Sequence, residues 1–120
     1  MDSTTTVLDL KEQVKKFRDD RDWEQYHNAK DLAIGIITES AELLDIFRFK
    51  SLDEVDGMFH NRKKLVEIKD ELADVCIMVL ALSQRYSIDL SQSITAKLKK
   101  SARKYPIRKS RGSNKKYTEL

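Results

Sequence analysis

The sequence is poor in residues that interrupt helices or cross-link chains: among 120 residues there are one proline, three glycines and one cysteine. A lone cysteine excludes an internal disulfide, and Cys76 is expected to pack within its apolar segment. The chain also has only two histidines, so no zinc site of the Cys/His type is expected. Because Leu, Ile, Ala, Lys and Glu are plentiful, the composition favours helix.

Long apolar runs and strand-like alternation are absent as well. No apolar stretch reaches the roughly 18 residues that a membrane span needs. The N-terminus lacks the charged-then-apolar pattern of a signal peptide. Apolar residues recur at helical spacing, and no run alternates as a half-buried strand does. We therefore expect a soluble, cytoplasmic protein of the all-α class, with no membrane partner.

Charge is distributed unevenly along the chain. Residues 97–120 carry ten Lys or Arg and one acid, so their net charge of +9 leaves −6 for residues 1–96. An acidic body with a basic end predicts cations bound at one place and an anionic ligand at the other, while a solvated basic tail explains the charge equally well. We expect one all-α domain over residues 1–106 and a basic, flexible tail over residues 107–120.

The apolar periodicity predicts four main helices. Their expected bounds are about Thr6–Trp23, Ala29–Phe47, Arg62–Tyr86, and a helix capped by Asp89 that ends before Pro106. A short helix is predicted after Ser51, because Ser51 and Glu54 have the spacing of a capping box.

The second and third of these main helices are apolar over most of their circumference. A helix of this kind is normally buried on all sides, and a chain this short has few other helices to surround both. We therefore expect a four-helix bundle completed by homo-oligomerisation, most simply with two-fold symmetry. A monomer with a crowded four-helix core is the alternative.

Two pairs of carboxylates interrupt these apolar helices. The segment TESAELLD, residues 38–45, contains Glu39 and Glu42, and KDELADV, residues 69–75, contains Glu71 and Asp74. Residues three apart share one helix face, so antiparallel packing of the two helices would bring the four carboxylates together. Without a partner they would repel one another and lose hydration. A hard divalent cation such as Mg²⁺ or Mn²⁺ resolves this conflict.

A solvated helix face, ion pairs and a di-iron centre are the alternatives to such a cation site. Acidic residues three apart are common on solvated helix faces, although two copies inside apolar helices are less so. Ion pairs with Arg48 or Lys69 are disfavoured, because both side chains turn away from the acidic stripe. A di-iron bundle typically needs Glu-x-x-His, and within the two helices that carry the carboxylate pairs no histidine follows a Glu at that spacing. The pattern thus favours a redox-inert cation.

A divalent cation beside lysines and arginines indicates phosphate chemistry. The metal bridges phosphate oxygens and activates water, while basic side chains offset the remaining charge. Trp23, Tyr26 and His27 lie just before the second predicted helix and offer stacking surfaces for a base. Ordinary packing in the core is the alternative interpretation of Trp23 and Tyr26.

With these motifs in place, the sequence resembles the MazG-like all-α nucleoside triphosphate pyrophosphohydrolases, and most closely their dCTP pyrophosphatase branch. The resemblance runs from about Arg21 to Leu120 and is carried by RDWEQYHNAK, ESAELLDIF, DELADV, and KYP followed by RGSNKKYTEL. It implies an enzyme that cleaves between the α and β phosphates of a deoxynucleoside triphosphate, with dCTP or a modified dCTP as the leading substrate. Such house-cleaning enzymes remove unwanted nucleotides from the cellular pool. It also implies a dimer or tetramer whose sites are shared between subunits.

The resemblance further implies roles for individual residues. Glu39, Glu42, Glu71 and Asp74 would hold Mg²⁺ and prepare the attacking water. The base would meet Trp23, His27 and Phe49, and the phosphates and sugar would meet Lys30, Lys97, Lys104 and Tyr105. The chain departs from the family pattern at Asp31 and Ser101, where relatives have Asn. Since an amide donates hydrogen bonds that a carboxylate cannot, the preferred base and sugar stay open.

Two interpretations in which the protein is not an enzyme remain. A helical module that binds nucleic acid through residues 97–116 has the basic cluster in its favour. The acidic body and the lack of a helix-turn-helix or other reader motif argue against nucleic acid as a partner. A structural oligomer whose carboxylates only stabilise assembly is the weaker interpretation.

Overall fold

The computed structural model describes residues 1–120, and it confirms the all-α class. Six α-helices and two 3₁₀ turns make up the regular structure, with no strand: α1 Val7–Asp19, η1 Glu24–Tyr26, α2 Ala29–Phe47, α3 Leu52–Met58, α4 Arg62–Arg85, α5 Leu90–Lys104, α6 Ile107–Ser110 and η2 Tyr117–Glu119. The chain forms two compact units, Met1–Ser87 and Ile88–Leu120. None of the helices combines the length and apolar character that a membrane crossing requires.

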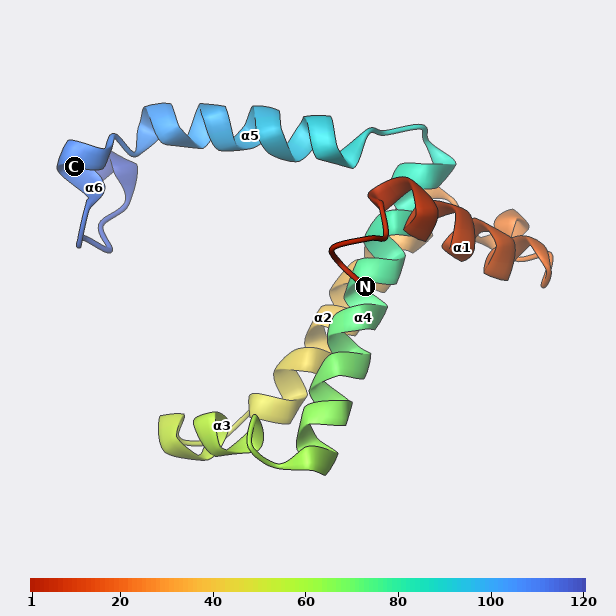
Figure 1. Ribbon diagram of the computed structural model, residues 1–120, viewed down its shortest axis with the longest axis horizontal. Coiled ribbons are helices and arrows are strands. Elements are labelled where there is room, and N and C mark those ends of the chain that lie inside the picture. Colours follow the sequence, from red (N-terminus) through yellow and green to blue (C-terminus); the bar gives the residue numbers. More distant parts are fainter. The chain divides into compact units, whose positions relative to one another are not determined.

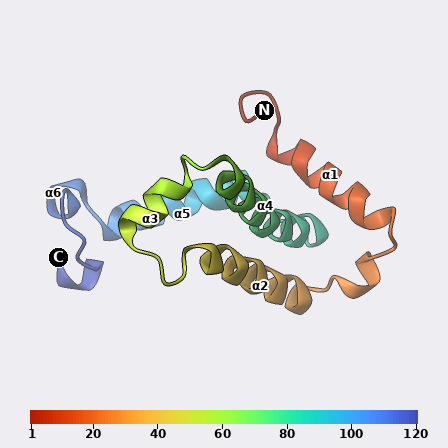
Figure 2. The same cartoon turned by 90° about the horizontal axis from the view of Figure 1, so that it is seen from below.

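The first unit is organised around α2 and α4. These two helices run antiparallel and lie side by side, with α1 packed on α4 and α3 at the turn that joins them (Figures 1 and 2). The buried apolar residues are Leu32 of α2, Met58 of α3, and Ile68 and Ala81 of α4. The antiparallel packing that the carboxylate argument required is therefore present within one chain.

A glycine lets α2 and α4 approach closely. A Cβ atom added to Gly35 would lie 2.8 Å from the Sδ atom of Met78, so any larger residue would force the Met78 side chain to move. Gly35 is one turn before Glu39 on α2, and Met78 is one turn after Asp74 on α4. The close approach thus lies directly beside the predicted metal site.

Local hydrogen bonds explain where most helices begin. Thr6 and Asp9 form a reciprocal capping box at the start of α1. The predicted caps are confirmed at α3, where Ser51 accepts from the Glu54 amide, and at α5, where Asp89 accepts from the Gln92 amide. The predicted bounds of α2 match the structure, and α4 ends one residue earlier than expected, with Tyr86 as its C-cap.

The prediction that the first helix continues to Trp23 is wrong. The helix ends at Asp19, and the amides of Arg21 and Trp23 both donate to the Arg18 carbonyl, at 3.2 and 3.1 Å. Asp22 adopts the left-handed conformation, with φ of 52°. This hydrogen-bonded turn reverses the chain without a glycine or proline, the residues whose presence would have indicated the break.

The single chain does not bury the apolar faces of α2 and α4 on all sides. Ile37 is 71% exposed, and Ile34, Leu44, Val66 and Leu72 are also exposed. The expected burial of these helices is therefore not achieved within one chain. Exposed apolar faces of this extent on the central helices are typical of surfaces that pack against another subunit.

The second unit, Ile88–Leu120, contains α5, α6 and the 3₁₀ turn η2. The rings of Tyr105 and Tyr117 meet edge to face at 5.9 Å, and the Lys104 ammonium lies 4.8 Å from the centre of the Tyr117 ring. These contacts link the end of α5 to the C-terminal segment. The predicted division of the chain at residue 106 stays a prediction.

Candidate metal and nucleotide site

The structure brings three of the four predicted carboxylates together. Glu39 and Glu42 of α2 and Glu71 of α4 each offer an oxygen, and these oxygens all lie within 4.8 Å of one another. Glu39 and Glu71 are partly buried, whereas Glu42 is exposed. Asp74 is outside this group of three, but its carboxylate is near enough to influence the pKa values of Glu39 and Glu71.

Glu39 and Glu71 lie in an environment that raises the pKa of each carboxyl group and so disfavours its charged form. Burial is the main cause that raises the pKa of Glu39, and the adjacent carboxylates of Glu42, Asp74 and Glu71 raise it further. Burial also raises the pKa of Glu71, with Glu42 as the next cause. None of the ion pairs of the structure joins these carboxylates to a Lys or Arg. The negative charge of the cluster is thus not balanced by a basic side chain.

The donor set of this cluster fits a hard divalent cation. The Oε2 atom of Glu71 is buried and has no hydrogen-bond partner, which is costly for a carboxylate oxygen. A ligand bond to a metal would satisfy it, and a cation among three or four carboxylates would offset their repulsion. With oxygen donors alone, the cluster suits Mg²⁺ or Mn²⁺ better than softer metals.

Trp23 and His27 lie close together just before α2. Their ring centres are 6.0 Å apart, and Trp23 also meets Phe17 of α1 edge to face at 5.7 Å. Trp23 is 41% exposed, so part of its ring is open to a ligand. The Tyr86 hydroxyl, at the end of α4, accepts a hydrogen bond from the Ala29 amide at 2.8 Å and ties the start of α2 to α4. Lys30 lies in the first turn of α2 and is exposed.

Phe49, the third predicted base-binding residue, lies beyond the other end of α2. Since α2 has 19 residues and rises about 1.5 Å per residue, roughly 28 Å separates its two ends. Phe49 is 90% exposed, has φ of 62°, and carries the Arg48 guanidinium over its ring at 4.6 Å. One chain therefore does not bring Phe49 to Trp23 and His27.

The remaining predicted site residues belong to the second unit. Lys97 and Lys104 lie on α5, and Tyr105 is its C-cap. Lys104 and Tyr105 both contact Tyr117, a residue that no sequence motif singled out. Their aromatic and cationic grouping offers a surface for an anionic ligand, and their roles stay predictions.

Two further residues near Trp23 and His27 are not explained by the sequence motifs. Arg18 is buried and donates from Nε to the Nδ1 atom of His27 at 2.9 Å. No motif indicated Arg18, because an arginine within a charged helix is normally solvated. Asp31, noted only as a departure from the family, accepts from the Asn28 amide side chain at 2.7 Å and so supports the start of α2.

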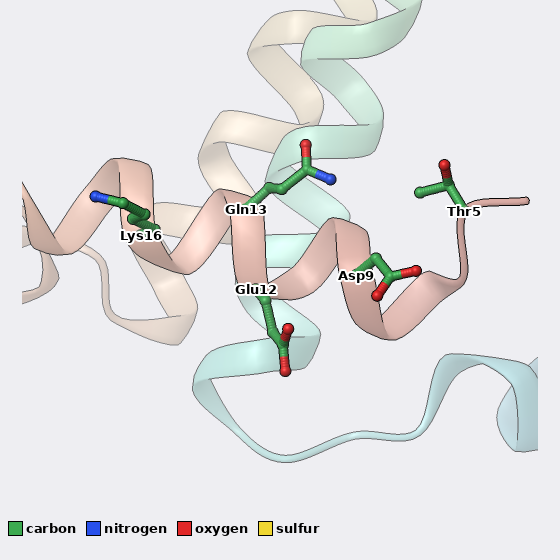
Figure 3. Close-up of a pocket in the computed structure, with 5 residues that line it drawn as sticks. All are labelled: Thr5, Asp9, Glu12, Gln13 and Lys16. Atoms are coloured by element: carbon green, nitrogen blue, oxygen red, sulfur yellow. The ribbon is translucent and has the colours of Figure 1, made fainter. Parts of the chain in front are cut away.

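An open hollow on α1 contains none of the predicted site residues. It is lined by Thr5, Asp9, Glu12, Gln13 and Lys16. Figure 3 shows Glu12 and Gln13 leaving the helix in opposite directions in that view, and Asp9 is already engaged in the capping box with Thr6. The hollow lacks convergent functional groups, so we do not regard it as a ligand site.

Comparisons with known proteins relate the chain to a family. The profile of the MazG-like family matches residues 34–120, which include both carboxylate pairs. The chain belongs to the MazG-like family. MazG-like relatives include dCTP pyrophosphatase 1 of Bos taurus, 33% identical over 98% of this chain and 70% of the relative. The corresponding protein of Mus musculus is 35% identical over 96% of this chain and 68% of its own length.

The fold of the chain is also similar to that of a solved structure. A pyrophosphatase from Archaeoglobus fulgidus is 40% identical, with a TM-score of 0.73, and the match covers 79% of this chain and 87% of that one. The resemblance drawn from the sequence motifs is thereby confirmed. The expected enzyme class, a nucleoside triphosphate pyrophosphohydrolase, is confirmed as well.

Proposed function

We propose that this chain is a Mg²⁺-dependent enzyme that cleaves the bond between the α and β phosphates of a deoxynucleoside triphosphate. The products would be the monophosphate and pyrophosphate, and dCTP or a modified dCTP is the substrate to test first. The observation that carries the proposal is the meeting of Glu39, Glu42 and Glu71 across α2 and α4, with unbalanced charge and a buried, unpartnered oxygen. The name of the mammalian relatives, dCTP pyrophosphatase 1, supports the choice of nucleotide.

The carboxylates divide into two roles in the proposed mechanism. Glu39, Glu42 and Glu71 would hold Mg²⁺, which when bound supplies charge stabilisation to the phosphates and a more acidic water. Asp74 is near enough to act electrostatically on Glu39 and Glu71 without being one of the three converging ligands. It would complete the ligand set or accept the proton of the attacking water.

The nucleotide would be oriented at both ends. Trp23, which is partly open, would stack on the base, and His27 would lie at its edge. Lys30, Lys97, Lys104 and Tyr105 would neutralise and position the phosphates and sugar. Loss of pyrophosphate develops negative charge on the leaving group, and lysine ammonium groups near it would stabilise that charge.

The separation of Trp23 and Phe49 supports an active form that contains more than one chain. About 28 Å of helix stands between them, so a base pocket that uses both must take Phe49 from a second copy. The exposed apolar residues of α2 and α4 offer the surface for such an assembly. A homodimer or homotetramer with shared sites is therefore part of the proposal.

The test is a product assay on the purified protein. It would be incubated with Mg²⁺ and each of the common and 5-modified deoxynucleoside triphosphates, and the products separated by chromatography. Monophosphate with pyrophosphate is the expected result, with the cytosine nucleotides ranked first. Diphosphate with phosphate would show that the cleavage point is wrong.

Absence of turnover would overturn the proposed activity. If Mg²⁺ then still raised the melting temperature, the carboxylates would serve assembly alone. Strongly salt-dependent binding to duplex DNA without turnover would instead favour the nucleic-acid module.

A further inference from the structure

A buried arginine connects three elements of the first unit. Arg18, at the end of α1, is 4% exposed. Its Nε donates to Nδ1 of His27 at 2.9 Å, and its Nη1 donates to Oε1 of Gln84 in α4 at 3.3 Å. The Nη2 atom is buried without a hydrogen-bond partner. The guanidinium is therefore held in place by a ring nitrogen and an amide, neither of which is charged in this arrangement.

The direction of the hydrogen bond fixes the chemical state of His27. A guanidinium is always protonated in proteins and only donates, so Nδ1 must accept and carries no proton. The proton of a neutral imidazole then sits on Nε2, which makes no hydrogen bond within the chain. Protonation of Nδ1 would set two donors against each other.

The surroundings of the ring support the neutral state. Burial is the main cause that lowers the pKa of His27, and the positive charge of Arg18 lowers it further. The carboxylate of Asp31 acts in the opposite direction but does not reverse the shift. Geometry and electrostatics thus agree on a neutral ring with its proton on Nε2.

Stability alone does not account for a buried guanidinium at this position. A buried charge without a carboxylate partner loses hydration and is not repaid by an ion pair, and apolar residues of similar volume often stabilise such sites better. What Arg18 does provide is a rigid, planar donor that holds the ring of His27 in one orientation.

We propose that Arg18 is a positioning residue that fixes His27 as the Nε2–H tautomer and so makes it an obligatory hydrogen-bond donor to the nucleotide. The ligand atom it serves must be an acceptor, such as a ring nitrogen or carbonyl oxygen of the base, or a sugar oxygen. This role rests on the proposed function, because that function places a nucleotide beside Trp23 and His27. The Arg18–His27 arrangement itself does not depend on turnover.

The tautomer is tested without nucleotide by NMR of ¹⁵N-labelled protein. The His60→Gln background leaves His27 as the only imidazole in the chain. We expect an unprotonated Nδ1 and a protonated Nε2 at neutral pH, with a pKa below the ordinary value. Arg18→Met should raise that pKa and mix the two tautomers. A protonated Nδ1 with Arg18 present, or a spectrum unchanged by Arg18→Met, overturns the proposal.

Nucleotide kinetics test whether the fixed donor matters to the substrate. We expect Arg18→Met to raise KM for the best deoxynucleoside triphosphate about tenfold and to change kcat less than twofold. Arg18→Lys keeps a hydrogen-bond donor and a positive charge, so its KM should lie between those of Arg18→Met and the unaltered protein. This second variant also tests the role of Arg18 if Arg18→Met folds poorly. If NMR shows both tautomers of His27 in Arg18→Met but KM is unchanged, Arg18 has no role in substrate binding.

Gln84→Leu is the matched control. It removes the other hydrogen bond of Arg18 while leaving the bond to His27, so the melting temperature should fall while tautomer and KM stay within twofold of their original values. Equal effects of Arg18→Met and Gln84→Leu on KM would reduce Arg18 to a structural role. The proposed function itself fails separately, if the unaltered protein hydrolyses no nucleotide while the NMR result stands.

Discussion

Two groups of buried or partly buried charge lie at different places along α2, and neither contains an ion pair. In the middle of the helix, Glu39, Glu42 and Glu71 bring like charges together and leave them unbalanced. Before the start of the helix, Arg18 is a single cation held by neutral acceptors on His27 and Gln84. The first cluster lacks a positive counter-charge, whereas the cation of the second is held by two hydrogen bonds. One suits a bound metal and the other suits orientation of a ligand.

The largest effect is expected from removing Glu42 of the first cluster or the neighbouring Asp74. Glu42→Gln or Asp74→Asn should lower kcat/KM by about 100-fold or more, because metal-assisted charge stabilisation contributes several kcal/mol to the transition state. The fold should persist, since loss of a ligand also relieves repulsion. Steady-state kinetics at fixed Mg²⁺ would measure the loss.

Asp45→Asn is the control for this experiment. Asp45 lies on the same helix, three residues after Glu42, and pairs at 3.7 Å with Arg48. Its substitution should leave kcat/KM within about twofold, because exposed ion pairs contribute little. Equal losses in Asp45→Asn and Glu42→Gln would contradict a specific metal cluster.

The next largest effect concerns the assembly. Ile37→Glu places a charge on a residue that is 71% exposed in the single chain, so the helix itself should tolerate it. If this face packs against a second chain, the buried charge should dissociate the oligomer and lower activity about tenfold or more. Sedimentation velocity would give the mass and circular dichroism the helix content. An oligomer of unchanged mass would exclude this face from the interface.

A smaller effect is expected from the stacking residues. Trp23→Ala should raise KM about tenfold with little change in kcat, since stacking of an aromatic ring on a base contributes roughly 1–3 kcal/mol. Phe49→Ala should act in the same direction. Mixed oligomers of the two variants should recover part of the affinity, because a shared site can combine the intact Trp23 of one chain with the intact Phe49 of another. No recovery on mixing would place the two residues in separate sites.

The smallest effect is on stability in the absence of metal. The pKa of Glu39 is raised in the folded state above its usual 4.5, so its contribution to stability is full below pH 4.5 and is lost as the pH rises through the folded value. Glu39→Gln should therefore raise the metal-free melting temperature at pH 7 by a few degrees, and the gain should shrink toward pH 4.5. Mg²⁺ should stabilise the unaltered protein and not the variant. Differential scanning calorimetry with and without a chelator would test both.

Helical periodicity predicts the acidic cluster because all its members lie on two regular helices. Once α2 and α4 pack antiparallel, a spacing of three residues decides which side chains meet. The preference of Ser and Asp for helix N-caps separately predicts Ser51 and Asp89 as caps, as the structure confirms. Asp74 shows where periodicity fails as a predictor of contacts. The spacing predicts that Asp74 joins the cluster as Glu71 does, but the structure leaves Asp74 outside the three converging carboxylates.

The cluster around Arg18 is not predictable in this way. It joins α1, the loop before α2 and the end of α4. It depends on a turn in which Asp22 is left-handed, and no glycine or proline in the sequence indicates that turn. The expected helix through Trp23 would have sent Arg18 and His27 in unrelated directions. Periodicity describes contacts within and between regular helices, and it has no information on residues that a loop brings together.

The contact between Gly35 and Met78 has a consequence for how the proposed metal site can change during evolution. These two uncharged residues, one turn away from Glu39 and Asp74, share a fixed volume: a Cβ on Gly35 would stand 2.8 Å from the Met78 sulfur. Any gain in size at residue 35 must be matched by a loss or a rearrangement at residue 78, or the helices separate and the carboxylates with them. Two uncharged substitutions at residues 35 and 78 could therefore change the spacing of the carboxylates, and with it the affinity of the proposed site for a metal, while every carboxylate is retained.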